Sequence, residues 1–214
     1  MLQVSPRSER RVTPDAFSVK EHFHGGKRFF DAAEQVEVVK ILSGDCHVSS
    51  KPDEVLVTIL GSCVSACIRD PLCGIGGMNH FLLPGSEATS AACESTRYGV
   101  FAMETLINGI LKAGGCKNRL EVKVFGGGNV INHSARIGSQ NAHFIREFLL
   151  REGFRIASED LEGDFPRRIH YYPATGRVMV RRLLRQEDMR VAAQEALYLQ
   201  KITRAPLEGK IELF

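Results

Sequence analysis

Length, composition and charge restrict the class of protein that this sequence can encode. The chain has 214 residues, of which 43% are hydrophobic and 25% are charged, and a formal net charge of +3. These values predict one sizeable folded core. The small net charge disfavours a dedicated nucleic-acid binder, which presents a strongly basic face. No apolar stretch approaches the ~20 residues that span a bilayer, and the charged N-terminus does not resemble a secretion signal. We therefore expect a cytoplasmic protein without membrane insertion.

The N-terminal half predicts an arm followed by strands. Residues 1–30 contain prolines, glycines and charges with little periodicity, which indicates a flexible arm. Short apolar or alternating runs, separated by turn residues, then predict four strands over residues 37–42, 55–60, 64–68 and 74–83. Because short turns join these strands, we expect neighbouring strands to pair antiparallel.

The C-terminal half predicts helices among further strands. A polar loop is expected up to about Arg97, and apolar residues at helical spacing then predict a helix from Val100 to Leu111. Ser139 is the predicted N-cap of a second helix that ends at Gly153. The remaining predicted elements are strands over 120–124 and 154–157, a hairpin formed by 169–172 and 178–180, and a helix over 186–201.

Together these elements predict a single α/β domain of the α+β type, with a mixed or antiparallel sheet and flanking helices. We divide the chain into the flexible arm over residues 1–30, a folded domain over 31–185, and a C-terminal helix and tail over 186–214.

The six cysteines are expected to be free thiols. A chain without an export signal stays in a reducing compartment, where disulfides are rare. The cysteines therefore direct attention to catalysis, metal binding or plain burial. Their positions are Cys46, Cys63, Cys67, Cys73, Cys93 and Cys116.

Cys63 is the strongest candidate for a nucleophile. It follows Gly61-Ser62 at the end of a predicted buried strand. A turn of this kind leaves backbone N–H groups unpaired, and such groups can hold an oxyanion. His80 lies 17 residues later on the third strand of a predicted meander, within reach of Cys63. A Cys–His pair stabilises thiolate beside imidazolium. The alternative is that both are ordinary buried side chains.

Zinc binding is the competing chemistry for these residues. Cys63, Cys67, Cys73 and His80 form a C-x3-C-x5-C-x6-H string, which lacks the paired spacing of common structural zinc sites. On one strand, Cys63 and Cys67 would lie roughly 13 Å apart, which is too far for one ion. We therefore predict no metal site and interpret Cys67 and Cys73 as buried thiols.

A glycine loop and two arginine pairs are the remaining patterns. Gly126, Gly127 and Gly128 follow a predicted strand, but no GK[ST] sequence follows them, so they do not form a P-loop. The loop is either a tight turn with positive φ angles or a wall of the active site that lends N–H groups. The pairs Arg167-Arg168 and Arg181-Arg182 are interpreted as a solvated basic surface.

Six short segments follow one another along the chain: Leu-Gly-Ser-Cys-Val at 60–64, Cys-Ile-Arg-Asp-Pro at 67–71, Gly-Gly-Met-Asn-His-Phe-Leu-Leu-Pro at 76–84, Tyr-Gly at 98–99, Phe-Gly-Gly-Gly-Asn at 125–129 and Ile-Gly-Ser-Gln-Asn at 137–141. Together these segments resemble the CheD family, the chemoreceptor glutamine deamidases of bacterial chemotaxis. The resemblance covers about residues 35–185, with the segments in the family's order.

The resemblance implies a three-layer α/β sandwich and a Cys–His–Thr catalytic set that needs no metal or organic cofactor. Cys63 and His80 match the first two positions. An ungapped match places Val57 at the threonine position, and strand side chains alternate between faces, so we assign the neighbouring Thr58, brought round by a small bulge. The alternative is that a backbone carbonyl orients His80. Ser62 and the glycines at 126–128 are expected at the oxyanion site or the cleft wall.

The function implied by the resemblance is conversion of specific receptor glutamines to glutamate. The route is a thioester on Cys63 that releases ammonia and is then hydrolysed. The implied partners are methyl-accepting chemotaxis receptors and a CheC-type phosphatase, with recruitment to receptor arrays in the cytoplasm. One alternative is a non-enzymatic adaptor that binds receptors or the phosphatase through the same cleft. Another is a related thiol hydrolase that acts on receptor methyl esters.

Overall fold

The fold consists of strands and helices that run through most of the chain. The computed structural model describes residues 28–83, 89–130 and 135–183, together with Ala193, Glu195, Leu197, Tyr198 and Gln200. Its elements are β1 Arg28–Asp31, β2 Val36–Lys40, β3 Cys46–Ser49, β4 Glu54–Leu60, β5 Val64–Asp70, β6 Ile75–Asn79, α1 Thr89–Lys112, the short 3-10 helix η1 Lys117–Arg119, β7 Glu121–Gly126, α2 Ala135–Arg151, β8 Ile156–Leu161, β9 Arg167–Tyr172 and β10 Arg177–Arg182.

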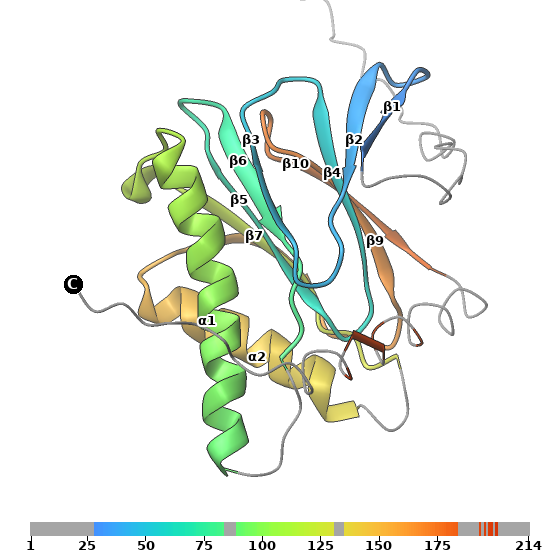
Figure 1. The fold of residues 1–214 in the computed structure, drawn as a ribbon, viewed down its shortest axis with the longest axis vertical. Coiled ribbons are helices and arrows are strands. Elements are labelled where there is room, and N and C mark those ends of the chain that lie inside the picture. The colour runs from blue at the N-terminus through green and yellow to red at the C-terminus, as the bar shows by residue number, and fades with distance from the viewer. Residues whose placement is uncertain are drawn as a thin grey trace, which may run out of the picture.

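The described elements form three layers, as the resemblance implies. One five-stranded sheet has the order β1-β2-β4-β9-β10, and the other has the order β3-β6-β5-β7-β8. The second sheet lies between the first sheet and the helices α1 and α2 (Figure 1). The prediction of an α+β sandwich is confirmed, but its strands are divided between two mixed sheets rather than placed in one.

Two apolar layers hold the sandwich together. The layer between the sheets includes Leu56 and Leu60 of β4 and Met78 of β6. The layer between the second sheet and the helices includes Ile68 of β5 and Leu106 of α1. All five side chains are fully buried. The middle sheet therefore contacts apolar side chains on both faces, which explains why every residue of β5 except Arg69 is buried.

The predicted pairing of the opening strands is wrong at two places. The strands β4 and β5 do not pair with each other, because β4 lies in the first sheet and β5 in the second. The three residues 61–63 therefore cross between layers instead of closing a hairpin. The strands β2 and β4 pair parallel, because β3, which the sequence pattern did not reveal, runs through the other sheet between them. The hairpin of β9 and β10 and the antiparallel pair of β5 and β6 are confirmed.

Several element boundaries also differ from the predictions. Helix α1 begins at Thr89, within the expected polar loop, where Ala91 and Ala92 are strong helix formers. Helix α2 begins at Ala135, so Ser139 lies inside the helix instead of capping it.

The two ends of the predicted domain division are described only in part. Residues 1–27 of the expected arm lie outside the described residues, whereas residues 28–30 belong to β1. Of the predicted helix over 186–201, five residues are described, and all five are helical. They are Ala193, Glu195, Leu197, Tyr198 and Gln200.

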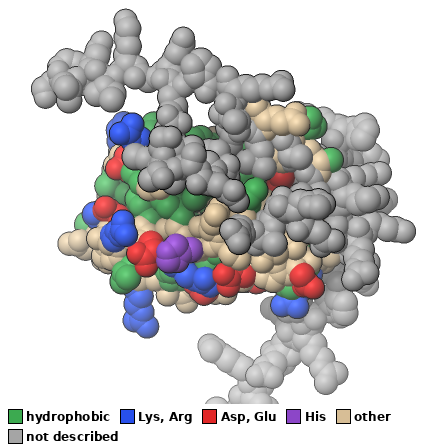
Figure 2. Space-filling view, turned by 90° about the horizontal axis from the view of Figure 1, so that it is seen from below, with side chains coloured by type: hydrophobic (Ala, Val, Ile, Leu, Met, Phe, Trp, Pro, Cys, Tyr) green, Lys and Arg blue, Asp and Glu red, His purple; other side chains and the backbone are tan. Residues whose placement is uncertain are grey.

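The surface of the described part carries charges of both signs. Lys and Arg side chains alternate with Asp and Glu side chains on the face shown in Figure 2. Among the described residues, no helix combines the length and apolar character that a membrane span requires.

The helix layer provides a test of the packing. Leu106 of α1 is fully buried, and a Cβ built on Gly77 of β6 would lie 2.8 Å from its Cδ1 atom. We expect Leu106→Ala to lower the free energy of unfolding in urea by about 2–5 kcal/mol, because the cavity cannot be refilled. Phe101→Ala on the same helix is the matched control, since Phe101 is 67% exposed, and it should change stability by less than about 0.5 kcal/mol. Equal losses in the two variants would contradict this packing.

Candidate active site

The connection between the sheets carries the predicted nucleophile. Residues 61–63 join the end of β4 to the start of β5, and Cys63 is 0% exposed in the core between the sheets. The three backbone N–H groups of this connection bind a side-chain carboxylate instead of a neighbouring strand. The crossing therefore places a thiol beside a cluster of backbone donors.

His80 is fixed immediately after β6 by its backbone. The strand ends at Asn79, so His80 follows it and does not occupy the middle of a strand as predicted. Its N–H donates to the carbonyl of Asp45 at 3.0 Å, and its carbonyl accepts from the N–H of Gly44 at 2.7 Å. Phe81 next to it pairs with Val64 in an isolated bridge. These contacts hold His80 against the loop over residues 42–45 and beside the crossing.

Thr58 orients the His80 ring. The Thr58 hydroxyl donates its one proton to the carbonyl of Ile41 at 2.7 Å, and its oxygen lies 2.8 Å from Nδ1 of His80. Since that proton is already used, the hydroxyl oxygen accepts from an Nδ1–H group. The lone pair of a neutral His80 ring is then on Nε2, on the opposite side of the ring. This is the tautomer that can act as a base toward a thiol.

Both predicted ways of orienting His80 occur together. The strand β4 pairs with β9 in unbroken register from Leu56 to Leu60, so Thr58 reaches His80 without the expected bulge. The carbonyl of Ile41 also lies 3.5 Å from Nδ1 of His80. Val57 packs in the separate apolar cluster with Val38 and Val55. The structure therefore brings Thr58 to His80 and directs Val57 elsewhere.

Ser43 connects the histidine to the thiol. Its Oγ atom lies 3.0 Å from Nε2 of His80 and 3.9 Å from Sγ of Cys63. A hydroxyl in this position can accept a proton from the thiol and donate one to the imidazole. No sequence motif indicates this role, because Ser43 reads as an ordinary turn residue next to Gly44.

Burial favours the uncharged form of both Cys63 and His80. It raises the pKa of the Cys63 thiol well above the ordinary value of 9.0, and the nearby Glu195 carboxylate raises it further. Burial lowers the pKa of His80 below the ordinary value of 6.5. Each shift favours the uncharged form. The resting pair is therefore thiol and neutral imidazole, with Ser43 between them.

The amide donors beside Cys63 bind Glu195, which no sequence motif indicated. The N–H groups of Gly61 and Cys63 donate to its Oε1 atom at 2.9 and 3.0 Å. The N–H and the hydroxyl of Ser62 donate to its Oε2 atom at 2.8 and 2.6 Å. Successive amides that point to one place form an anion-binding concavity. Ser62 therefore lies where an oxyanion or cleft residue was expected.

The glycine loop over residues 126–128 is hydrogen-bonded to the backbone of the crossing. Gly126 and Gly127 have φ angles of 110° and 64°, as expected for a tight turn. The N–H groups of Gly127 and Gly128 donate to the carbonyls of Cys63 and Gly61, each at 2.7 Å. These two amides are thus already bonded, and the loop holds the crossing in place instead of lending them to an oxyanion.

Arg167 fastens the same loop and corrects the interpretation of the arginine pairs. It is fully buried, and its guanidinium donates to the backbone carbonyls of Gly126, Asp160 and Glu162. Arg168 is also buried, at 7% exposure. The predicted solvated basic surface is therefore wrong for this pair, because alternation along β9 does not expose either residue.

Among the cysteines that the structure describes, none forms a metal-ligand set with Cys63. Among the described residues, no group of three or more His, Cys, Asp or Glu side chains is arranged to hold a metal ion. Cys67 is buried as expected, whereas Cys73 is exposed. The four residues of the string considered for zinc are thus not brought together.

Comparisons with known proteins agree with the sequence resemblance. The family model described as "CheD chemotactic sensory transduction" matches residues 82–182. A protein of Rhodopseudomonas palustris named "Probable chemoreceptor glutamine deamidase CheD" is 52% identical over 88% of this chain and 89% of its own length. Proteins of the same name from Hydrogenovibrio crunogenus and Janthinobacterium are 46% and 44% identical, over 86% and 91% of this chain and 97% of their own lengths.

This chain belongs to the CheD family. Among solved structures, the Bacillus licheniformis hypothetical protein YfiH aligns at 14% identity with a TM-score of 0.37, over 56% of this chain and 50% of its own.

The structure of this chain brings together the side chains that the resemblance singled out, namely Thr58, Cys63 and His80. Their catalytic roles stay a prediction.

The support from the glycine loop can be tested with two glycines that share a left-handed backbone. Gly126 and Gly153 have φ angles of 110° and 74°, so alanine is strained at both. A Cβ at Gly126 would overlap the carbonyl oxygen of Cys63, whereas a Cβ at Gly153 would meet nothing within 4 Å. We expect Gly153→Ala to destabilise the protein by about 1–2 kcal/mol and Gly126→Ala by clearly more, in urea unfolding. Similar losses would show that the loop does not press against the crossing.

Proposed function

We propose that this chain is a protein-glutamine deamidase that acts on methyl-accepting chemotaxis receptors. The relatives that cover its length at 44–52% identity are named as probable chemoreceptor glutamine deamidases. The observation that carries the proposal is the chain of contacts Thr58–His80–Ser43–Cys63, which ends beside three converging backbone N–H groups. A nucleophile, its base and an oxyanion site are the parts that acyl transfer needs.

The first half of the reaction forms a thioester. The Cys63 thiol gives its proton through Ser43 to Nε2 of His80 as the sulfur attacks the carboxamide carbon of the substrate glutamine. The amide N–H groups of residues 61–63 stabilise the oxyanion that develops. The C–N bond then breaks, and the His80 imidazolium donates its proton to the leaving ammonia. Cys63 is left acylated.

The second half restores the enzyme. His80 accepts a proton from a water molecule as that water attacks the thioester carbon. The C–S bond breaks, the thiol is re-formed, and the substrate side chain leaves as glutamate. In both halves Thr58 keeps the proton of His80 on Nδ1, so that Nε2 stays available. None of these steps requires a metal or an organic cofactor.

The proposed place of action follows from the substrate. The CheD resemblance implies that the substrate glutamines lie in the cytoplasmic part of the receptors. The enzyme would therefore work at receptor arrays. We include a CheC-type phosphatase as a second proposed partner, on the family resemblance alone.

Peptide mass spectrometry of a cytoplasmic receptor fragment tests this function. After incubation with the protein, specific glutamines should gain roughly one dalton, and Cys63→Ala should abolish the gain because no acyl intermediate can form. His80→Ala should slow the reaction by about 10²–10⁴-fold through loss of the general base. Binding of several receptor fragments without any mass change would favour the adaptor alternative.

A matched pair on β4 controls for packing. Thr58→Val keeps the shape of the side chain but removes the hydroxyl, and we expect it to lower kcat by about 10²-fold through misplacement of His80. Val57→Ala shortens a neighbouring side chain on the other face and should leave kcat nearly unchanged. Equal effects of the two substitutions would remove Thr58 from the mechanism.

A further inference from the structure

A carboxylate of the chain itself fills the place where the substrate side chain must bind. Glu195 lies more than 130 residues after the crossing, is 3% exposed, and accepts all four hydrogen bonds that residues 61–63 offer it. We propose that the C-terminal segment with Glu195 and Tyr198 is an internal ligand of the active site, bound as the deamidation product would be. This inference rests on the proposed function, because that function defines what the product is.

The chemistry of Glu195 matches the product of the proposed reaction. Deamidation leaves a glutamate side chain on a helical substrate, and Glu195 is a glutamate in a helical segment. Its Oε1 atom, bonded to the N–H groups of Gly61 and Cys63, occupies the position that the oxyanion would take next to the nucleophile. A carboxamide is planar and of similar size, so its oxygen can take the place of Oε1 between the N–H groups of Gly61 and Cys63. Its NH2 group can donate to the Ser62 hydroxyl but cannot accept from the Ser62 N–H, so a glutamine binds less tightly here than the glutamate product.

The space for this carboxylate depends on a glycine. A Cβ added to Gly61 would lie 2.8 Å from Oε2 of Glu195 and 3.0 Å from its carboxyl carbon. Gly61 is not among the glycines with positive φ, so its backbone conformation is open to any residue. The absence of a side chain at Gly61 therefore leaves room for the carboxyl group of a ligand. The backbone conformation at this position does not require glycine.

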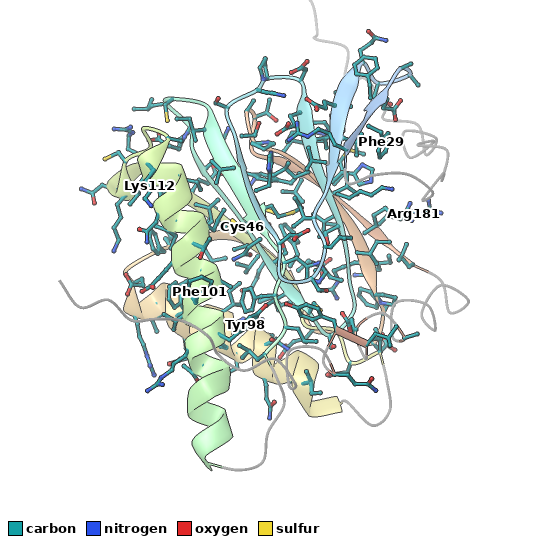
Figure 3. The ribbon with its side chains drawn as sticks, in the orientation of Figure 1. Phe29, Cys46, Tyr98, Phe101, Lys112 and Arg181 are labelled. Atoms are coloured by element: carbon teal, nitrogen blue, oxygen red, sulfur yellow. The ribbon has the colours of Figure 1, made fainter. Side chains whose placement is uncertain are left out.

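Tyr198 provides a second point of attachment. It lies three residues after Glu195, on the same face of the helical segment. Its hydroxyl is hydrogen-bonded to the hydroxyl of Tyr98, which lies on α1 (Figure 3). A Cβ on Gly44, which precedes the loop residue Asp45, would lie 2.5 Å from the Tyr198 hydroxyl. Leu197 is 67% exposed, so the contacts belong to the face of Glu195 and Tyr198.

The docked segment inhibits the enzyme until a substrate displaces it. It occupies the oxyanion site, and its charge adds to the effect of burial in raising the pKa of the Cys63 thiol. A substrate helix must displace it before its glutamine can reach Cys63. The described contacts thus make the C-terminal segment a competitor of the receptor.

Replacing Glu195 by glutamine turns the internal ligand into an internal substrate. In Glu195→Gln, Cys63 attacks the side-chain carboxamide, ammonia leaves, and water releases the thioester, which regenerates glutamate at position 195. Peptide mass spectrometry should show a gain of roughly one dalton at residue 195 at a rate independent of protein concentration, and none in the double variant with Cys63→Ala. Gln200, which is exposed on the same segment, is the internal control and should stay unchanged.

Thiol reactivity tests docking without any substrate. Iodoacetamide should modify Cys63 about tenfold faster or more in Glu195→Ala than in the natural sequence, because the charge-assisted hydrogen bonds that hold the segment are lost. Leu197→Ala is the control and should leave the rate unchanged. Peptide-resolved mass spectrometry separates Cys63 from the other cysteines.

The outcomes separate this inference from the proposed function. An unchanged alkylation rate in Glu195→Ala would overturn the internal ligand, whatever the activity on receptors. Receptor deamidation by Glu195→Gln with residue 195 left intact would overturn the product-like placement. Faster alkylation of Cys63 in Glu195→Ala, with no deamidation of receptors, would support the internal ligand while the proposed function fails.

Discussion

The chain changes sheets at Gly61, Ser62 and Cys63, and the candidate site depends on this crossing. The strand β4 ends in one sheet and β5 begins in the other, so neither sheet uses the three N–H groups between them. The N–H groups of the glycine loop bind the carbonyls of Gly61 and Cys63. The N–H groups of residues 61–63 are therefore left for another partner. The candidate nucleophile and the proposed oxyanion site thus arise from one short connection.

The buried N–H groups of residues 61–63 require a hydrogen-bond acceptor. An N–H group left unsatisfied in the interior costs about 1–3 kcal/mol, and a buried carboxylate is tolerated only where it is hydrogen-bonded. Glu195 and residues 61–63 satisfy each other in this structure. When the segment leaves, the same unsatisfied donors favour the entry of another carboxyl or carboxamide group. The proposed inhibition by the chain's own residue and the proposed recognition of a substrate therefore have one physical origin.

The neutral state of the reacting pair fits this arrangement. Burial disfavours both thiolate and imidazolium, so the resting site holds no ion pair. Proton transfer through Ser43 would then accompany attack on the substrate. The oxyanion of the proposed reaction would be stabilised by amides already in position, which need no reorganisation.

The sequence predicted those parts of the site that lie in compact motifs. Cys63 and His80 are recognisable because each follows a strand in a segment that resembles one family. Thr58 was assigned correctly to the neighbourhood of His80, but for a reason that the unbroken register of β4 does not support. The β9–β10 hairpin was predictable because its strands have clear apolar patterns and turn residues, whereas the three-layer arrangement was implied by the family resemblance.

The remaining features depend on long-range geometry that local patterns do not encode. A three-residue connection can close a hairpin or cross between sheets. Residues 61–63 cross because β5 pairs in a second sheet, which also contains β3, and no local pattern reveals that sheet. Ser43 reads as a turn residue until the loop over 42–45 packs against His80. Glu195 reads as a polar position of an amphipathic helix, and its partners lie more than 130 residues earlier.

Trapping the acyl intermediate tests the central claim most directly. A receptor fragment would be incubated with the protein in the presence of hydroxylamine, which attacks a thioester in place of water. The account predicts a hydroxamate at the same glutamines that are otherwise converted to glutamate, and its loss in Cys63→Ala. Conversion to glutamate with no hydroxamate at any hydroxylamine concentration would contradict a thioester on Cys63.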